Sequence, residues 1–360
     1  MSFIDRLLDP FRGKAITIPP YDGAFKPNNA LDDASVQFQH NAPDNLVLWA
    51  GKVLFSSNAS IFAIAGETAD KVADYDADIS ALAVLSDDAL LVALENGTLV
   101  VRGGVHDGRT FDHLGSNRLI CPTAVSVLDA TTVVVAEGSN HHAPSDWVVD
   151  LMGKRATGSV WKLDITTGEA TLLADKLAWP SGVHAATDGT VQVSEAFAHR
   201  IVRVDPKNQR ANVKPVLTRI PGYPGKLSTS ANGGFWLSVF APRNRLIEFV
   251  LQEDAFRHDM LKTVEREHWI APALSSGTSF LEPLQCGSVR TMGVHKPWAP
   301  SRSYGLAVRL DNRFQPLESF HSRSDGKRHG LTSVLETGQS VLASVKGADL
   351  ILDLGKGDKL

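Results

Sequence analysis

The sequence predicts an all-β protein, and two observations support this prediction. From about residue 40 onward, short apolar runs are separated by turns rich in Asp, Asn and Gly, and many of the runs alternate between apolar and polar residues. Alternation of this kind is typical of half-buried strands, and such turn residues commonly join them. A similar unit of three strands also recurs roughly every 40–50 residues, the period of propeller blades. We therefore expect a β-propeller rather than a βαβ fold, in which helices alternate with strands.

The repeated unit is clearest at residues 80–104, 181–205 and 332–354. Each copy begins with small residues, passes through a strand, a polar turn and a second strand, and ends with a third strand. The chain has 360 residues, of which 43% are hydrophobic. This length suits a propeller, which grows by adding blades around an axis. We expect one propeller domain over residues 1–360.

Three segments depart from this pattern. Residues 1–14 predict a short amphipathic helix lying on the wall of the propeller, with a membrane-surface anchor as the alternative. Residues 245–269 carry apolar side chains at spacings of three and four and predict a helix. Together with the loop that follows, they form an insert over residues 245–300 that we expect to cover one channel mouth. Residues 15–18 are expected to pair with the last blade, which removes an exposed sheet edge.

Composition excludes several function classes. The formal net charge is −4 and the basic residues are scattered, which argues against a nucleic-acid partner. No apolar run approaches 18 residues, so no membrane span is expected. The first residues lack the apolar core of a signal peptide, and we expect a cytoplasmic protein. Cys121 and Cys286 have no metal-binding spacing, and a reduced, buried thiol is expected at Cys121.

The run from Trp179 to Asp205 resembles a signature of the strictosidine synthase-like superfamily. It reads WPSGVHAATDGTVQVSEAFAHRIVRVD, where the family has Pro-Asn-Gly before one strand and an Ala-Glu motif after the next turn. Residues 220–244, beginning IPGYPGKL, resemble a further family stretch, and residues 43–57 are similar to the first blade of paraoxonases. The superfamily also includes the SMP-30/gluconolactonase proteins. The resemblance implies a six-bladed propeller with a pocket at one end of its channel, but it does not fix one reaction.

The resemblance also implies four positions for the ligands of a divalent metal ion. Metal-dependent relatives place an acidic pair in blade one, which is retained in type as Asp44 and Asn45. The other positions fall near Thr123, at Ser181, and at Gly225 and Lys226. Ca²⁺ requires six to eight oxygen ligands, and one carboxylate beside a lysine supplies too few. We therefore disfavour Ca²⁺ and expect no cofactor.

Lys226 and Asp44 are predicted to meet across the channel where the metal would lie. In one interpretation, Lys226 orients or polarises a substrate carbonyl. In the other, the two residues form a structural ion pair that plugs the channel.

Strictosidine synthases rely on a Glu just before the first strand of the last blade, and the matching position here is at or beside His329. A histidine there can act as a general base near neutral pH, or it can simply cap the strand. We predict that Asp44, Lys226 and His329 converge as catalytic residues.

Four further residues are candidates for binding the substrate, namely Asn45, Ser181, His184 and His142. His184 would line the pocket if its side chain faces the channel, and His142 follows an apolar strand in a loop that we place at the pocket mouth. Glu195 matches the family closely, but we expect it to accept backbone N–H bonds.

These residues favour a small-molecule enzyme that hydrolyses a lactone or ester-like bond without a standard Ca²⁺ site. The alternatives are a metal-free protein that binds small molecules or condenses an amine with an aldehyde, and a propeller that serves as an interaction platform.

Overall fold

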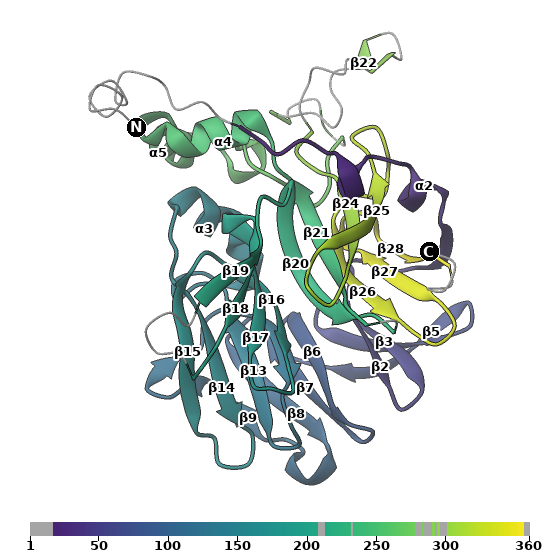
Figure 1. The fold of residues 1–360 in the computed structure, drawn as a ribbon, viewed down its shortest axis with the longest axis vertical. Helices are drawn as coiled ribbons and strands as arrows, with labels where there is room; N and C mark the ends of the chain where they lie inside the picture. Colours follow the sequence, from purple (N-terminus) through teal and green to yellow (C-terminus); the bar gives the residue numbers. More distant parts are fainter. Residues whose placement is uncertain are drawn as a thin grey trace.

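The computed structural model describes residues 17–207, 213–231, 233–277, 279, 282–283, 290–291, 294–295 and 301–355. The helix predicted within residues 1–14 and Cys286 lie outside the described residues. The described chain is mostly β, with six four-stranded sheets and short helices (Figure 1). Within that part, no helix is long and apolar enough to cross a membrane.

The six sheets are the blades of a propeller, numbered here in chain order. Blades one to three, each from the innermost strand outward, are β2 (Pro43–Trp49), β3 (Lys52–Ser57), β4 (Ser60–Ala65), β5 (Thr68–Asp74); β6 (Ile79–Ser86), β7 (Ala89–Leu94), β8 (Thr98–Gly103), β9 (Thr110–Phe111); and β12 (Pro122–Val127), β13 (Thr132–Glu137), β14 (Gly158–Asp164), β15 (Ala170–Leu177). Blades four to six are β16 (Pro180–Ala185), β17 (Val191–Glu195), β18 (Arg200–Val204), β19 (Val213–Leu217); β20 (Gly222–Thr229), β21 (Phe235–Pro242), β24 (Gly305–Leu310), β25 (Pro316–Ser322); and β26 (Leu331–Glu336), β27 (Val341–Val345), β28 (Leu350–Asp353), β1 (Ser35–Gln39). The first strands of neighbouring blades contact one another around the whole ring, so the predicted six-bladed propeller is confirmed.

The smaller elements lie between these strands. Two short hairpins are β10 (His113–Leu114) with β11 (Asn117–Arg118), and β22 (Arg290–Thr291) with β23 (Val294–His295). The short helices and turns are η1 (Gly23–Phe25), α2 (Ala30–Asp33), η2 (Gly104–His106), η3 (Pro144–Asp146), α3 (Trp147–Gly153), η4 (Ala196–Ala198), η5 (Arg266–His268) and η6 (Lys346–Ala348).

The ring closes by pairing its two ends, but not with the predicted segment. Strand β1 pairs antiparallel with β28, with Ser35 opposite Asp353 and Gln39 opposite Leu350. The prediction that residues 15–18 close the ring is wrong: Thr17 and Ile18 belong to no strand, and residues 15 and 16 are not described. Prolines 19 and 20 follow directly and have no N–H to donate to a ladder, whereas residues 35–39 contain none.

The core consists of layers between neighbouring blades. Val133 and Val135 of β13 pack toward blade two, for instance against Leu91, whereas Val134 of the same strand packs toward blade four against Val193. Successive side chains of a strand point to opposite faces. Because both faces of this strand are covered, its sequence is continuously apolar over residues 133–136.

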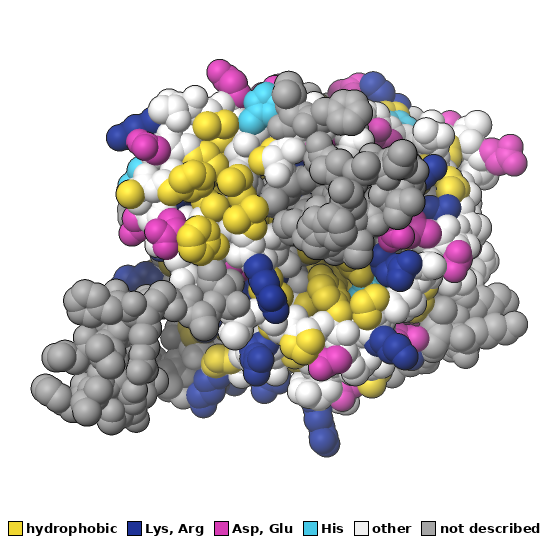
Figure 2. Space-filling view, turned by 90° about the horizontal axis from the view of Figure 1, so that it is seen from above, with side chains coloured by type: hydrophobic (Ala, Val, Ile, Leu, Met, Phe, Trp, Pro, Cys, Tyr) yellow, Lys and Arg dark blue, Asp and Glu magenta, His cyan; other side chains and the backbone are white. Residues whose placement is uncertain are grey.

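The helical pattern predicted for residues 245–269 forms two helices, α4 (Arg245–Gln252) and α5 (Asp254–Thr263), which are followed by η5. The side chain of Asn244 caps α4 by accepting the N–H of Leu246 at 2.8 Å. Figure 1 shows α4 and α5 beyond one end of the sheets, with α3 beneath them. Apolar side chains gather on the face seen in Figure 2. Four exposed ones belong to this segment, namely Leu246, Phe249, Phe256 and Val264.

Candidate functional site

All six first strands are irregular near their beginning. In each blade the pairing between the first and second strands shifts register there, as in a β-bulge. The residues at these shifts include Asn45, Ser80, Thr123, Ser181, Lys226 and Thr332. Because all six strands begin at the same end of the channel, these positions surround one mouth of the propeller. Bulges re-aim side chains, so this end is a natural place for a site.

In blades three and four, the residues at the bulges tie neighbouring blades together. The hydroxyl of Thr123 donates to the carbonyl of Pro180 at 2.5 Å, and that of Ser181 donates to the carbonyl of Pro224 at 2.6 Å. Both residues are buried. Ser181, predicted to bind substrate, therefore uses its proton to hold blade four to blade five.

Asn45 has a similar position in blade one. Its side-chain amide donates to the Ser56 hydroxyl at 2.8 Å and reaches the Ile79 carbonyl of blade two at 3.4 Å. Its φ of 53° lies in the left-handed region, which Asn tolerates better than most residues. This conformation lets the Asn45 N–H donate to the carboxylate of Asp44 at 2.7 Å.

The predicted contact between Lys226 and Asp44 is present. The Lys226 Nζ lies 2.8 Å from Asp44 Oδ1. A second lysine, which the sequence analysis missed, completes the cluster: the Lys346 Nζ lies 3.5 Å from Asp44 Oδ2. The Asp44 side chain is only 10% exposed, so one buried carboxylate faces two ammonium groups.

Burial and charge act in opposite directions on Asp44. Burial alone would raise the pKa of the Asp44 carboxyl, but the charges of Lys226 and Lys346 and the hydrogen bonds from Lys226 and Asn45 lower it to about 2. For Lys226, burial is the largest influence and, together with the charge of Lys346, lowers the pKa of the amine, while Asp44 opposes this shift.

Glu95 is a further residue that the sequence analysis missed. Register pairs Ile79 with Leu94 in blade two and Leu331 with Val345 in blade six. Glu95 and Lys346 are thus equivalent, each being the first residue after the second strand of its blade. Their signal in the sequence is a charged residue directly after a buried apolar strand.

Glu95 has the electrostatics of a candidate acid or base. Burial raises the pKa of the Glu95 carboxyl, and a hydrogen bond with Ser145 and the charge of Lys346 offset only part of this rise. Lys346 therefore interacts with both carboxylates, Glu95 and Asp44.

The ring of His329 is held by partners in blade five. Its Nδ1 lies 2.7 Å from the Ser303 hydroxyl, and its Nε2 lies 2.7 Å from the carbonyl oxygen of Arg323. Nε2–H can donate to the carbonyl, and the Ser303 hydroxyl is a partner for Nδ1, so both ring nitrogens have hydrogen-bond partners. Ser303 precedes β24 and Arg323 follows β25. The hydrogen bonds of His329 thus favour the structural alternative over a general base.

The two other predicted histidines have different surroundings. His184 is near the far end of β16, about 10 Å along the strand from Ser181 by the usual rise per residue. Its ring meets Phe235 edge to face at 4.9 Å, and burial lowers the pKa of the imidazole. It therefore lies away from the mouth where the first strands begin.

His142 lies in the loop before η3. Its Nδ1 is 2.8 Å from Asp150 Oδ1, and Asp150, fully buried in α3, also accepts from the Ser139 hydroxyl at 2.7 Å. His142 is thus a partly exposed imidazole oriented by a buried carboxylate, without a described contact to Asp44.

Glu195 has the expected hydrogen bonds. Its carboxylate accepts the N–H of Ala178 at 2.9 Å and contacts Arg200 Nε at 2.5 Å. Cys121 is a free, buried thiol, as expected.

The residues at the implied metal-ligand positions do not fit a divalent cation. The Asp44 carboxylate contacts two ammonium groups, while the hydroxyls of Thr123 and Ser181 point at main-chain carbonyls. Over the part of the chain that the structure describes, no group of three or more His, Cys, Asp or Glu side chains could hold a metal ion.

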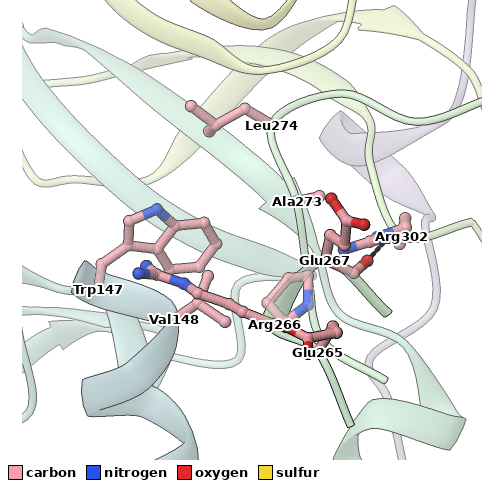
Figure 3. Close-up of a pocket in the computed structure, with 9 residues that line it drawn as sticks. Trp147, Val148, Glu265, Arg266, Glu267, Ala273, Leu274 and Arg302 are labelled. Carbon is pink, nitrogen blue, oxygen red and sulfur yellow. Dashed lines mark hydrogen bonds between the residues drawn. The ribbon is translucent and has the colours of Figure 1, made fainter. Parts of the chain in front are cut away.

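A cavity of about 510 Å³ lies beside this mouth (Figure 3). It is lined by Trp147 and Val148 of α3, by residues of and next to η5, and by Leu274 and Arg302. The Leu274 carbonyl packs closely on Gly347, and any side chain at position 347 would collide with this carbonyl. Since Gly347 follows Lys346, the cavity wall at Leu274 lies next to the segment that carries this lysine.

Comparison with known proteins agrees with this architecture. Residues 123–209 match the strictosidine synthase family. The chain is 32% identical to strictosidine synthase of Catharanthus roseus over 32% of its own length and 34% of that protein. It is 26% identical to the protein strictosidine synthase-like 2 of Arabidopsis thaliana, over 57% of this chain and 50% of that protein. It is also 25% identical to the adipocyte plasma membrane-associated protein of Danio rerio, over 47% of this chain and 45% of that protein. The matches thus span half or less of these relatives.

Solved structures extend the similarity to the whole fold. A gluconolactonase from Xanthomonas campestris superposes with a TM-score of 0.54 at 13% identity, covering 89% of this chain and 87% of the other. Regucalcin, a calcium-binding protein from Agrobacterium tumefaciens, superposes with a TM-score of 0.50 at 13% identity, covering 90% of this chain and 92% of the other. The chain is therefore a six-bladed β-propeller that matches the strictosidine synthase family over residues 123–209 and shares its overall fold with a gluconolactonase and with regucalcin.

Proposed function

We propose that this protein hydrolyses a lactone or ester-like bond of a small molecule at the channel mouth, without a metal ion. The observation that supports this most directly is the cluster in which Lys226 and Lys346 share the single carboxylate of Asp44. Such a cluster places two ammonium groups where the first strands begin. In metal-free ester hydrolysis, fixed N–H donors can replace a Lewis acid, since both stabilise negative charge on the carbonyl oxygen.

The charged residues can be given complementary roles. An ammonium group of Lys346 or Lys226 donates a hydrogen bond to the substrate carbonyl and stabilises the oxyanion. Glu95, whose pKa is raised by burial, accepts a proton from water as the water oxygen attacks the carbonyl carbon. The intermediate then collapses, the bond to the leaving oxygen breaks, and that oxygen takes the proton back from Glu95. One water is consumed, and one acid and one alcohol group are formed.

Condensation of an amine with an aldehyde is the second candidate, and the match to strictosidine synthase supports it. Two features weigh against it. A protonated amine would meet the positive cluster of Lys226 and Lys346. In addition, both ring nitrogens of His329 already have hydrogen-bond partners.

The test is hydrolysis of a panel of lactones and aryl esters by the wild type and by Glu95→Gln, Lys346→Met and Lys226→Met. We expect a loss of 10²-fold or more in kcat for Glu95→Gln, the usual scale for removing a general base. Lys162→Met, on an exposed strand position, is the matched control and should retain full activity. Equal activity of Glu95→Gln and wild type would refute the assigned roles. Turnover of an amine and aldehyde pair without ester hydrolysis would establish the second candidate instead.

A further inference from the structure

The cavity beside the channel mouth contains a buried cation, Arg302, for which the described residues provide no ion-pair partner. Arg302 is 8% exposed and lines the cavity. Its Nη1 donates to the main-chain carbonyl of Glu267 at 3.2 Å, but its Nε is buried without a partner. Within the described chain, no carboxylate lies at ion-pair distance from this guanidinium. Glu282 is near enough to raise the pKa of Arg302 slightly, although burial outweighs it and lowers that pKa.

The neighbouring arginine differs in this respect. Arg266 lines the same cavity, but its side chain is 47% exposed and pairs with Asp146 at 2.6 Å. It also donates to the carbonyl of Ser145 at 2.9 Å. Asp146 thus compensates the charge of Arg266, whereas no carboxylate among the described residues pairs with Arg302.

An uncompensated buried guanidinium is costly, because the charge loses its hydration without gaining an anion. Its planar fork of N–H donors matches the two oxygens of a carboxylate. Trp147, Val148 and Leu274 give the lining an apolar part, and the charged residues Glu265, Arg266 and Glu267 also line the cavity. In Figure 3, Trp147 and Val148 lie on the α3 side, and Arg302 lies across the cavity from them. A volume of about 510 Å³ accommodates a small organic molecule.

We propose that this cavity is a carboxylate-binding subsite, in which Arg302 holds the acid group of a small molecule whose apolar body lies against Trp147 and Leu274. This inference rests on the proposed function in one respect, since it identifies the substrate as a lactone or ester that also carries a free carboxylate. The cavity borders Lys346 through the packing of Leu274 on Gly347, so a ligand anchored at Arg302 can extend toward the cluster.

The test uses direct binding and does not depend on turnover. Calorimetry compares 3-phenylpropionate with its neutral counterpart, 3-phenylpropionamide, on the full-length wild type. We expect the carboxylate to bind roughly 10- to 100-fold more tightly, the scale of hydrogen bonds between charged groups. In Arg302→Met this preference should disappear, and in Arg302→Lys it should be partly retained. Arg266→Met is the matched control and should keep the preference within about threefold, because its partner is already in the protein.

Each outcome decides the question. Equal binding of the acid and the amide by the wild type would overturn the proposal, and this comparison needs no variant to fold. Equal loss of the preference in Arg266→Met and Arg302→Met would also overturn it, since the anion would not select the buried guanidinium. If binding follows the expected pattern while no ester is hydrolysed, the subsite stands and the proposed reaction fails. If esters are hydrolysed without regard to a carboxylate, the reaction stands and the subsite fails.

Discussion

The two halves of the channel mouth use polar and charged residues near the strand ends for different purposes. In blades three and four, the bulge residues Thr123 and Ser181 donate their hydroxyls to the next blade, so every proton is used within the protein. In blades one, five and six, charged side chains meet instead, and Asp44 is shared by two lysines. The first half ties neighbouring blades together, whereas the second brings charged side chains together.

The largest effect is expected from Asp44→Asn. This change leaves the ammonium groups of Lys226 and Lys346 facing each other without a carboxylate, in a place where the aspartate is buried. We expect a loss of about 3–5 kcal/mol in the free energy of unfolding, the usual scale for breaking a buried ion pair. Urea denaturation measures it. Asp175→Asn, at an exposed position, should change stability by no more than about 0.5 kcal/mol. Similar values for the two variants would show that the cluster is solvated.

Lys226→Met is expected to cost less than Asp44→Asn, because Lys346 remains to compensate the carboxylate. We expect about 2 kcal/mol from the lost charged hydrogen bond at 2.8 Å. Lys346→Met should reduce the free energy of unfolding by less than Lys226→Met, because its contact with Asp44 is longer, at 3.5 Å. The double variant should lose more than the sum of the two single variants, because it leaves the carboxylate without either lysine. Strict additivity in this double-mutant cycle would contradict a shared carboxylate.

The pH dependence of stability gives a third test. The pKa of Asp44 is about 2 in the folded protein, below its ordinary value of 3.8. The folded state therefore gains stability above the unfolded pKa, and this gain is lost as the pH falls from about 4 to 2. The contribution is about 2 kcal/mol. Burial lowers the pKa of His321 to about 4. The stability that its neutral ring contributes is therefore lost as the pH falls from about 6.5 to about 4. The free energies of unfolding of wild type and Asp44→Asn, measured as a function of pH, should therefore become equal only below pH 4. Equal values already near pH 6 would contradict the assignment.

Ser181→Ala is expected to have the smallest effect. The variant loses one neutral hydrogen bond and leaves the Pro224 carbonyl without that donor, at a cost of about 1 kcal/mol. Hydrolysis should be unchanged, because the hydroxyl serves the blade contact. A large fall in kcat with unchanged stability would return Ser181 to the role in substrate binding that the sequence suggested.

The sequence was sufficient for the fold and for part of the site. Repeating strands and turns predicted the propeller, and the strand starts placed Asp44 beside Lys226. Lys346 and Glu95 were missed because they follow second strands, and only antiparallel pairing brings those strand ends back to the same mouth. The surroundings of His329 could not be predicted either, since Ser303 lies 26 residues away in the sequence, just after the insert over residues 245–300.

The most direct test of the charged half as a metal-free site is the rate of lactone or ester hydrolysis before and after metal is removed with a chelator. The two ammonium groups at Asp44 replace the cation in this account, so the rate should stay the same after chelation and after Ca²⁺ is added back. A rate that falls to background with the chelator and returns with Ca²⁺ would contradict it.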